Sequence, residues 1–280
     1  LPRIEVLVVG KQRRRGFDNR MIPDAQKDPG AGDAPAFVVP CATLGMDAPW
    51  RWLRKGWLDL RRAPRLTAVF GVVIVLVSIL MAMLAWKLGR FALLATLLSG
   101  FVFVAPLICV GLYCVSRNLE RGRTPKLEDS FVLARRVLGQ AGVYALGQGV
   151  IVLLWSRAGM MVSALSPITA GDMRALWEFL IIGSLVGAVF AGLTFAVAAF
   201  SLPLIADRNV DMVTAGISSV HAVLRNKAVM ALWAFLIVVL TVVGFATAFI
   251  GLAVVMPWLA YAAWHAYRET LDPSAWPLLD

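Results

Sequence analysis

The sequence is poor in the residues on which most soluble enzymes depend. Only 16% of its 280 residues are charged and 60% are hydrophobic, whereas soluble domains are nearer to a quarter charged and half apolar. It holds two histidines and three cysteines, and Cys41, Cys109 and Cys114 form neither a CxxC pair nor a disulfide framework. Phosphate-binding, nucleophile-elbow, zinc-protease and dinucleotide motifs are missing as well. We therefore expect a membrane protein that is not an enzyme.

Long runs without charge take the place of these residues. The run 91–115, FALLATLLSGFVFVAPLICVGLYCV, is uncharged, and at about 1.5 Å per residue it exceeds the ~30 Å hydrocarbon core of a bilayer. Such a run must be helical, because lipid offers the backbone no hydrogen-bond partner. The sequence predicts an all-α polytopic membrane protein with six transmembrane helices arranged as three hairpins, the first with a tight connection at 87–90. The spans lie near 66–86, 91–115, 139–157, 177–205, 227–250 and 251–267.

Basic residues outnumber acidic ones by ten. They flank the apolar runs before position 66, at 117–136, at 208–227 and at Arg268, and six spans put all of these segments on one side of the membrane. Lys and Arg are enriched in cytoplasmic loops, so both termini are predicted to be cytoplasmic. No motif for reading bases or stacking on them accompanies the charge, so nucleic acid is not an expected partner.

Three amphipathic segments, 50–65, 125–138 and 210–226, are predicted to be interfacial helices on the cytoplasmic side. In each, apolar residues repeat at helical spacing: Trp50, Leu53, Trp57 and Leu60 in the first. Such helices direct aromatic residues toward lipid and Lys/Arg toward headgroups; packing on another protein is the alternative. Anionic phospholipids are thus expected partners. The candidate headgroup contacts are Arg51, Arg54, Lys55, Arg61, Arg62, Arg117, Arg121, Arg135 and Arg136. Asp59 lies among six basic residues and is expected to pair within its own helix, for example with Lys55 or Arg62.

The unit of an interfacial helix followed by a hairpin occurs three times. The second span of each hairpin contains a proline, namely Pro106, Pro203 and Pro257. Proline removes one helical hydrogen bond and bends a helix, so these three are candidate kinks. Internal repeats are common in transporters and also occur in inert scaffolds.

The two ends of the chain differ in character from the membrane domain at 50–268. Residues 21–48 are rich in Pro, Gly, Asp and Ala, so we expect 1–49 to be a flexible arm. Residues 1–20 lack periodicity and precede Met21, and we hypothesise that they are upstream sequence or a non-AUG extension. Residues 269–280 form a short polar tail.

Four polar residues near the span ends are weighed as functional candidates. His221 and His265 lie at similar depth on the cytoplasmic side, where two histidines can ligate haem b; we favour histidines bonded to carbonyls or headgroups and expect no cofactor. Arg157 and Glu178 lie near the outer ends of one hairpin and could pair. Ionisable groups inside a membrane are functional candidates, but at its edge they more often reach water.

Four segments carry a family resemblance: WRWLRKGWLD at 50–59, GLYCVSR at 111–117, SLPL at 201–204 and WHAYR at 264–268. They resemble a bacterial family of predicted integral membrane proteins of unknown function. The resemblance implies a location in the inner membrane and about six spans, and it supplies no catalytic residues. Some members carry labels that link them to cytochrome oxidase, although two histidines are too few for its haem–copper subunit.

Three functions remain in competition. The favoured one is a non-catalytic subunit or scaffold of a bacterial inner-membrane complex, such as a respiratory one, with other membrane subunits as partners. The second is a transporter or channel for a small solute. The third is a lipid-acting membrane enzyme, for which the available groups at the inner face are Asp59, Glu120, Glu128, Asp129, Asp207, Asp211 and His221.

Overall fold

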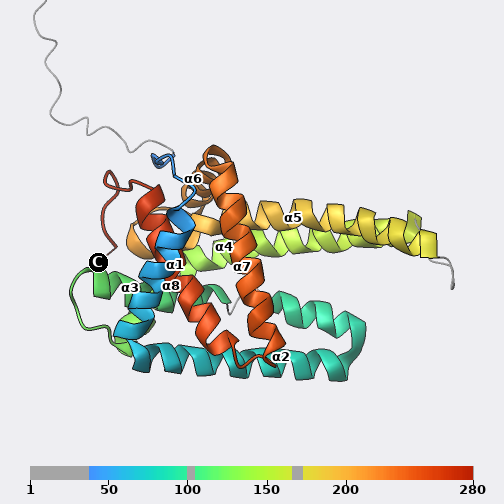
Figure 1. Cartoon of the computed structure of the whole chain (residues 1–280), viewed down its shortest axis with the longest axis horizontal. Coiled ribbons are helices and arrows are strands. Elements are labelled where there is room, and N and C mark those ends of the chain that lie inside the picture. Colours follow the sequence, from blue (N-terminus) through green and yellow to red (C-terminus); the bar gives the residue numbers. More distant parts are fainter. Residues whose placement is uncertain (1–37, 100–104, 166–172, 280) are drawn as a thin grey trace, which may run out of the picture. The chain divides into compact units, whose positions relative to one another are not determined.

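The computed structural model describes residues 38–99, 105–165 and 173–279, and its regular elements within them are all α-helices. Two isolated antiparallel bridges, Cys41 with Leu271 and Arg208 with Leu278, are the β-type pairings of these residues. The expected all-α class is confirmed (Figure 1). The helices are α1 (Ala48–Arg62), α2 (Pro64–Ser99), α3 (Ala105–Glu120), α4 (Leu127–Leu165), α5 (Met173–Asp207), α6 (Met212–Arg225), α7 (Lys227–Ala246) and α8 (Leu252–Thr270).

Four segments in the described part of the chain are long and apolar enough to cross a membrane: Pro64–Leu84, Leu127–Ala164, Met173–Asp207 and Lys227–Ala246. They contain most of the predicted spans 66–86, 139–157, 177–205 and 227–250. The second predicted span, 91–115, falls partly on residues 100–104, outside the described residues. The sixth, 251–267, lies on α8, which is not among the four. The described residues thus contain four candidate spans, and the count of six stays a prediction.

Helix boundaries differ from the sequence expectation at two places. Helix α2 is assigned as helical throughout 87–90, where a short connection was predicted, and its ribbon reverses direction toward its C-terminal end (Figure 1). The predicted interfacial helix at 125–138 is not a separate element, because it forms the first turns of α4. One glycine in a helix costs only about 1 kcal/mol relative to alanine, so Gly89 and Gly139 alone do not end these helices.

Helix α8 lies at the centre of the packed core. It contacts α1, α2, α3, α5 and α7, and Trp52, Trp233 and Trp264 are among the largest fully buried side chains of this core. The closest approach is to α1 at Gly56, where a Cβ atom would lie 2.7 Å from the backbone nitrogen of Ala262. Glycine is required here because no side chain fits between the two backbones.

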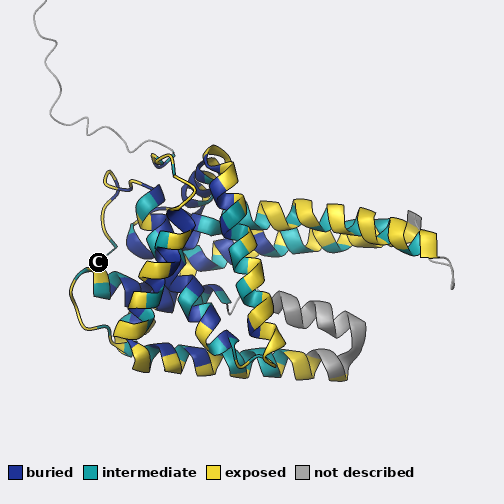
Figure 2. Cartoon of the chain, viewed as in Figure 1, coloured by how far each residue is buried: buried dark blue, intermediate teal, exposed yellow. Residues whose placement is uncertain are grey.

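Helices α4 and α5 lie side by side and run antiparallel (Figure 1). Toward the far end of the pair, away from the packed core, exposed residues predominate (Figure 2). These residues are mostly apolar, for example Leu154, Met161 and Trp177, which are 55%, 57% and 59% exposed. Water would oppose such exposure, whereas lipid tails are themselves apolar.

Both described ends of the chain are bonded to the helices. The N–H of Ala42 donates to the carbonyl of Thr270 (2.8 Å), and the N–H of Leu279 donates to the carbonyl of Asp207 (2.9 Å). The predicted arm therefore ends earlier than expected, since residues 38–47 are held against the protein. Its remainder, including the questioned residues 1–20, lies outside the described residues.

The three candidate kink prolines occupy different positions. Pro203 and Pro257 lie inside α5 and α8. Pro106 lies at the described start of α3, next to residues 100–104, which lie outside the described residues.

Candidate functional site

Polar side chains gather where α3, α5 and α8 end, together with the last turn of α1. The arginines come from sequence segments that are far apart, and they meet around buried carboxylates. We call this group the polar end cluster. Its members are Asp59, Ser116, Arg117, Glu120, Arg121, Asp207, Arg208, His265, Tyr267 and Arg268.

Asp207, the last residue of α5, is the main carboxylate of the cluster and is 3% exposed. Its Oδ2 accepts hydrogen bonds from the hydroxyl of Tyr267 (2.9 Å) and from Nε of Arg208 (3.3 Å). Guanidinium groups of Arg121 and Arg268 lie 3.6 Å and 3.7 Å from its oxygens. A buried carboxylate needs such partners because ionised groups are costly to remove from water. Asp207 thus ties α5 to α8 and to the end of α3.

Asp59 joins three helices at a second point. Its Oδ2 accepts from the hydroxyl of Ser116 on α3 (2.8 Å) and lies 2.8 Å from Nε2 of His265 on α8. The sequence expectation that Asp59 pairs within its own helix, with Lys55 or Arg62, is wrong. Asp59 lies on the buried face of α1, which packs on α8, so it faces away from those exposed residues.

Glu120 completes the connection between α3 and α8. Its carboxylate accepts from the indole N–H of Trp264 (2.9 Å) and from Nε of Arg268 (3.1 Å). Burial alone acts to lower the pKa of Arg268, but the neighbouring carboxylates of Glu120 and Asp207 outweigh it and raise that pKa above its ordinary value. Arg268 is therefore held as a cation between two carboxylates.

Arg117 donates to two backbone carbonyl groups. Its guanidinium donates to the carbonyl of Ala206 and to that of Leu279 (2.6 Å and 2.9 Å). Arg208 donates in the same way to the carbonyl of Trp276 (2.8 Å). Both arginines fix the C-terminal segment to the helix ends.

The predicted headgroup contacts separate into two groups. Arg51, Arg117 and Arg121 have partners within the protein, Arg51 with Glu269 and Asp47. Charge patterning along the chain does not reveal such long-range partners. The other six are exposed and face outward: Arg54, Lys55, Arg61, Arg62, Arg135 and Arg136.

The four polar residues that were considered as functional candidates have different surroundings in the structure. His265 is bonded to Asp59, whereas Nδ1 of His221 lies 3.6 Å from Sγ of Cys41. The described residues contain no group of three or more His, Cys, Asp or Glu that could hold a metal ion. The suggested pair of Arg157 and Glu178 is not formed, because Glu178 pairs with Arg174 one turn away on α5 (3.0 Å). Arg157 is exposed on α4.

The interfacial helices differ in how well their faces were predicted. On α6, Val213, Ile217 and Leu224 point outward while Ser218 and Ser219 are buried, as expected of a helix that turns its apolar stripe toward lipid. Asp211 caps this helix by accepting from the N–H of Thr214, a bond that lowers the pKa of Asp211.

On α1 the apolar face is rotated from the prediction. Trp52, which was not assigned to that face, is fully buried against Trp233 (ring centroids 5.5 Å apart), whereas Trp50 is exposed. Local spacing identified the helix correctly. It did not show which side would meet α8.

Ser116 offers a first test of the cluster. Replacing Ser116 with alanine is expected to destabilise the protein by about 1 kcal/mol, since one hydrogen bond to a buried carboxylate is lost. Thermal unfolding of the purified protein in detergent measures the change. Ser163→Ala on exposed α4 is the matched control and should shift the midpoint by much less; equal shifts would mean that the bond to Asp59 contributes nothing.

The four segments that carry the family resemblance meet in space. Segment 50–59 contributes Asp59, segment 111–117 contributes Ser116 and Arg117, and segment 264–268 contributes His265 and Arg268. Segment 201–204 lies in the last turns of α5, just before Asp207. The recurring sequence features therefore build one structural unit, the polar end cluster and the core beneath it.

Comparison with known proteins supports the membrane assignment. Residues 93–207 match a family described as predicted integral membrane protein (DUF2189). The match covers less than half of the chain and includes Arg117, Glu120 and Asp207. No curated protein and no solved structure matches the chain. The chain is thus similar to a family of integral membrane proteins, and its function must be argued from the structure.

Proposed function

We propose that the protein is a non-catalytic membrane subunit or scaffold of a bacterial inner-membrane complex. In this proposal six spans cross the bilayer, and the polar end cluster and both termini face the cytoplasm. Other membrane subunits bind to the exposed apolar helix faces, and no cofactor is required. A place in a respiratory complex is one form of this proposal.

One observation carries the proposal: the acidic and histidine side chains of the cluster are bonded to other helices of the same chain. Asp59, Glu120 and Asp207 are each hydrogen-bonded to at least two side chains. A general acid or base needs to reach a substrate, whereas these groups hold α1, α3, α5 and α8 together. This arrangement supports a structural role over a lipid-acting enzyme.

The charges around the cluster support the proposed orientation. Arg121, Arg208 and Arg268 lie at one end of the helices around Asp207, and the positive side of a membrane protein is usually cytoplasmic. The exposed basic residues at this level would bind anionic phospholipid headgroups, each contributing about 1 kcal/mol. They are Arg54, Lys55, Arg61, Arg62, Arg135 and Arg136.

Purification of the full chain from native membranes in a mild detergent tests the proposal. The expected result is a particle that contains other membrane proteins in fixed stoichiometry. Gly183→Leu is expected to reduce their recovery without changing the thermal midpoint, because nothing lies within 4 Å of a Cβ at Gly183 and small residues permit close approach of a partner helix. A lone monomer that conducts a solute in liposomes would instead support a transporter.

A further inference from the structure

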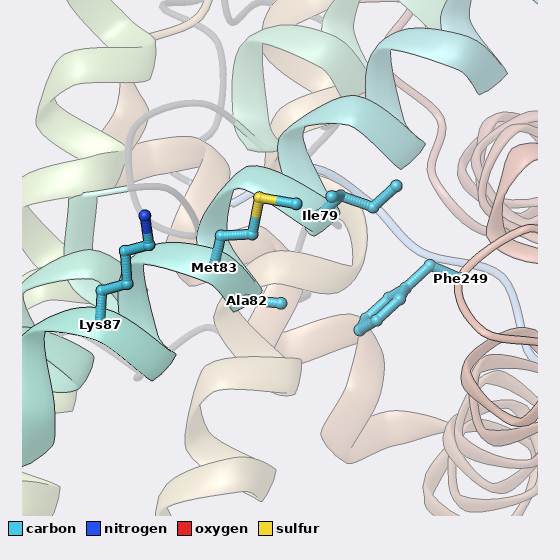
Figure 3. Close-up of a pocket in the computed structure, with 5 residues that line it drawn as sticks. All are labelled: Ile79, Ala82, Met83, Lys87 and Phe249. Atoms are coloured by element: carbon cyan, nitrogen blue, oxygen red, sulfur yellow. The ribbon is translucent and has the colours of Figure 1, made fainter.

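A shallow apolar groove lies between α2 and the turn that joins α7 to α8 (Figure 3). Its volume is about 280 Å³, and it is lined by Ile79, Ala82, Met83, Lys87 and Phe249. The α2 residues follow helical spacing, so they share one face. The ring of Phe249 is directed toward this face from the turn, and Lys87 lies one turn beyond Met83 (Figure 3). The groove thus has apolar walls and one cationic end.

The backbone that presents Phe249 is strained. Ala248 and Phe249 have φ values of 50° and 70°, in the left-handed region that costs a residue with a Cβ roughly 1–2 kcal/mol. Such conformations persist where the surrounding structure imposes them, and they concentrate at ligand sites. The ring is fixed further by edge contact with Phe245, at a centroid distance of 5.6 Å and an interplanar angle of 82°.

The groove lies one membrane thickness from the polar end cluster. Lys87 follows Arg65 by 22 residues in the same helix, a rise of about 33 Å, close to the ~30 Å hydrocarbon core. Lys87 and Phe249 are therefore placed at the headgroup level of the opposite leaflet.

We propose that this groove binds a phospholipid with an anionic headgroup. Its acyl chain lies along Ile79, Ala82 and Met83 against the ring of Phe249, and its phosphate pairs with the ammonium of Lys87. A lysine at the hydrocarbon edge extends its charged end toward headgroups while its stem packs on apolar surface. Charge complementarity thus selects the headgroup, and the apolar walls select a lipid over a free phosphate.

This proposal depends on the membrane-spanning helices and not on the scaffold role. It is tested with the full-length protein in detergent, incubated with equal amounts of phosphatidylglycerol and phosphatidylcholine, by counting bound lipids with native mass spectrometry. The wild-type protein is expected to retain phosphatidylglycerol preferentially. Lys87→Gln is expected to reduce that preference about fivefold, the effect of about 1 kcal/mol for one basic residue at a membrane surface.

Arg157→Gln is the matched control, because Arg157 is an exposed cation that does not line the groove. Its lipid preference should equal that of the wild type. If Lys87→Gln retains the full preference, or if Arg157→Gln loses as much, the proposed phosphate site is excluded.

The apolar half of the site is tested with two glycine variants of the turn. Phe249→Gly relieves the strain and removes the ring, so lipid retention should fall while the thermal midpoint does not. Ala248→Gly relieves the same kind of strain and leaves the ring, so retention should be unchanged. A fall in the midpoint without a fall in retention for Phe249→Gly would show that the ring serves only the fold and would overturn the proposal.

Discussion

Replacing Asp207 with alanine is expected to destabilise the protein by about 3–5 kcal/mol, the usual result of removing one partner from a buried ion pair. The carboxylate is 3% exposed and faces the cations of Arg121, Arg208 and Arg268. Its loss leaves these charges close together at the helix ends and removes the acceptor of the Tyr267 hydroxyl. The measurement is the thermal or denaturant unfolding midpoint of the full chain in detergent.

Two comparisons make this result specific. Asp207→Asn keeps the shape and one hydrogen-bond acceptor, so it should cost less than alanine. Glu178→Ala removes an exposed ion pair with Arg174, and exposed pairs contribute only about 0–1 kcal/mol. If Asp207→Ala and Glu178→Ala shift the midpoint equally, the cluster around Asp207 does not hold the helix ends together.

Gly56→Leu is expected to have the second large effect, a destabilisation of about 3 kcal/mol or more from overpacking. Even a Cβ atom at this position would lie 2.7 Å from the nitrogen of Ala262 and 3.0 Å from the carbonyl oxygen of Trp258. Both atoms belong to the backbone of α8 and cannot move aside, so α1 would have to separate from α8.

A glycine with free space around it provides a control in which the substitution is expected to raise stability rather than lower it. A Cβ atom at Gly142 on α4 would have nothing within 4 Å, and alanine is favoured over glycine inside a helix by roughly 0.5–1 kcal/mol. Gly142→Ala should therefore raise the unfolding midpoint slightly. Tolerance of leucine at Gly56 would mean that α1 is not packed on α8 as described.

The sequence predicted the structural elements that follow from local sequence patterns. Long uncharged runs identified the spans within α2, α4, α5 and α7, because lipid forces such runs to be helical. The stripe of Val213, Ile217 and Leu224 on α6 was also predictable, since its spacing alone defines a face. It points outward, as an interfacial helix requires.

Features that depend on contacts between distant segments could not be predicted. Asp59 was assigned a partner within α1, yet its partners are Ser116 and His265, 57 and 206 residues away. Periodicity reports which residues share a helix face, but it does not report which helix that face meets. The same limit explains why Trp52 was not recognised as a core residue.

The ordered contacts of the segment 38–47 could not be predicted from its composition either. Its composition resembles that of a flexible linker, rich in small residues and proline. Several long-range hydrogen bonds hold it, among them Val39 N–H to Ser218 Oγ, Leu44 N–H to Asn226 Oδ1, and Ala42 N–H to the Thr270 carbonyl. Backbone groups make these bonds, so side-chain composition carries little sign of them.

The polar end cluster is expected to lie on one side of a membrane and the far end of the α4–α5 pair on the other. Arg136 and Arg157 bracket an uncharged stretch of α4 that rises about 30 Å, which matches the hydrocarbon core. This spacing sets the depth of the helix without reference to any partner.

The most direct test labels single cysteines with a membrane-impermeant maleimide, after replacement of the three native cysteines. Arg123→Cys and Ser274→Cys, both exposed near the polar end cluster, should react in inverted vesicles and not in intact cells. Ser163→Cys, at the far end of α4, should react only from the opposite face. Labelling of Ser163→Cys from the same face as Arg123→Cys would contradict the account.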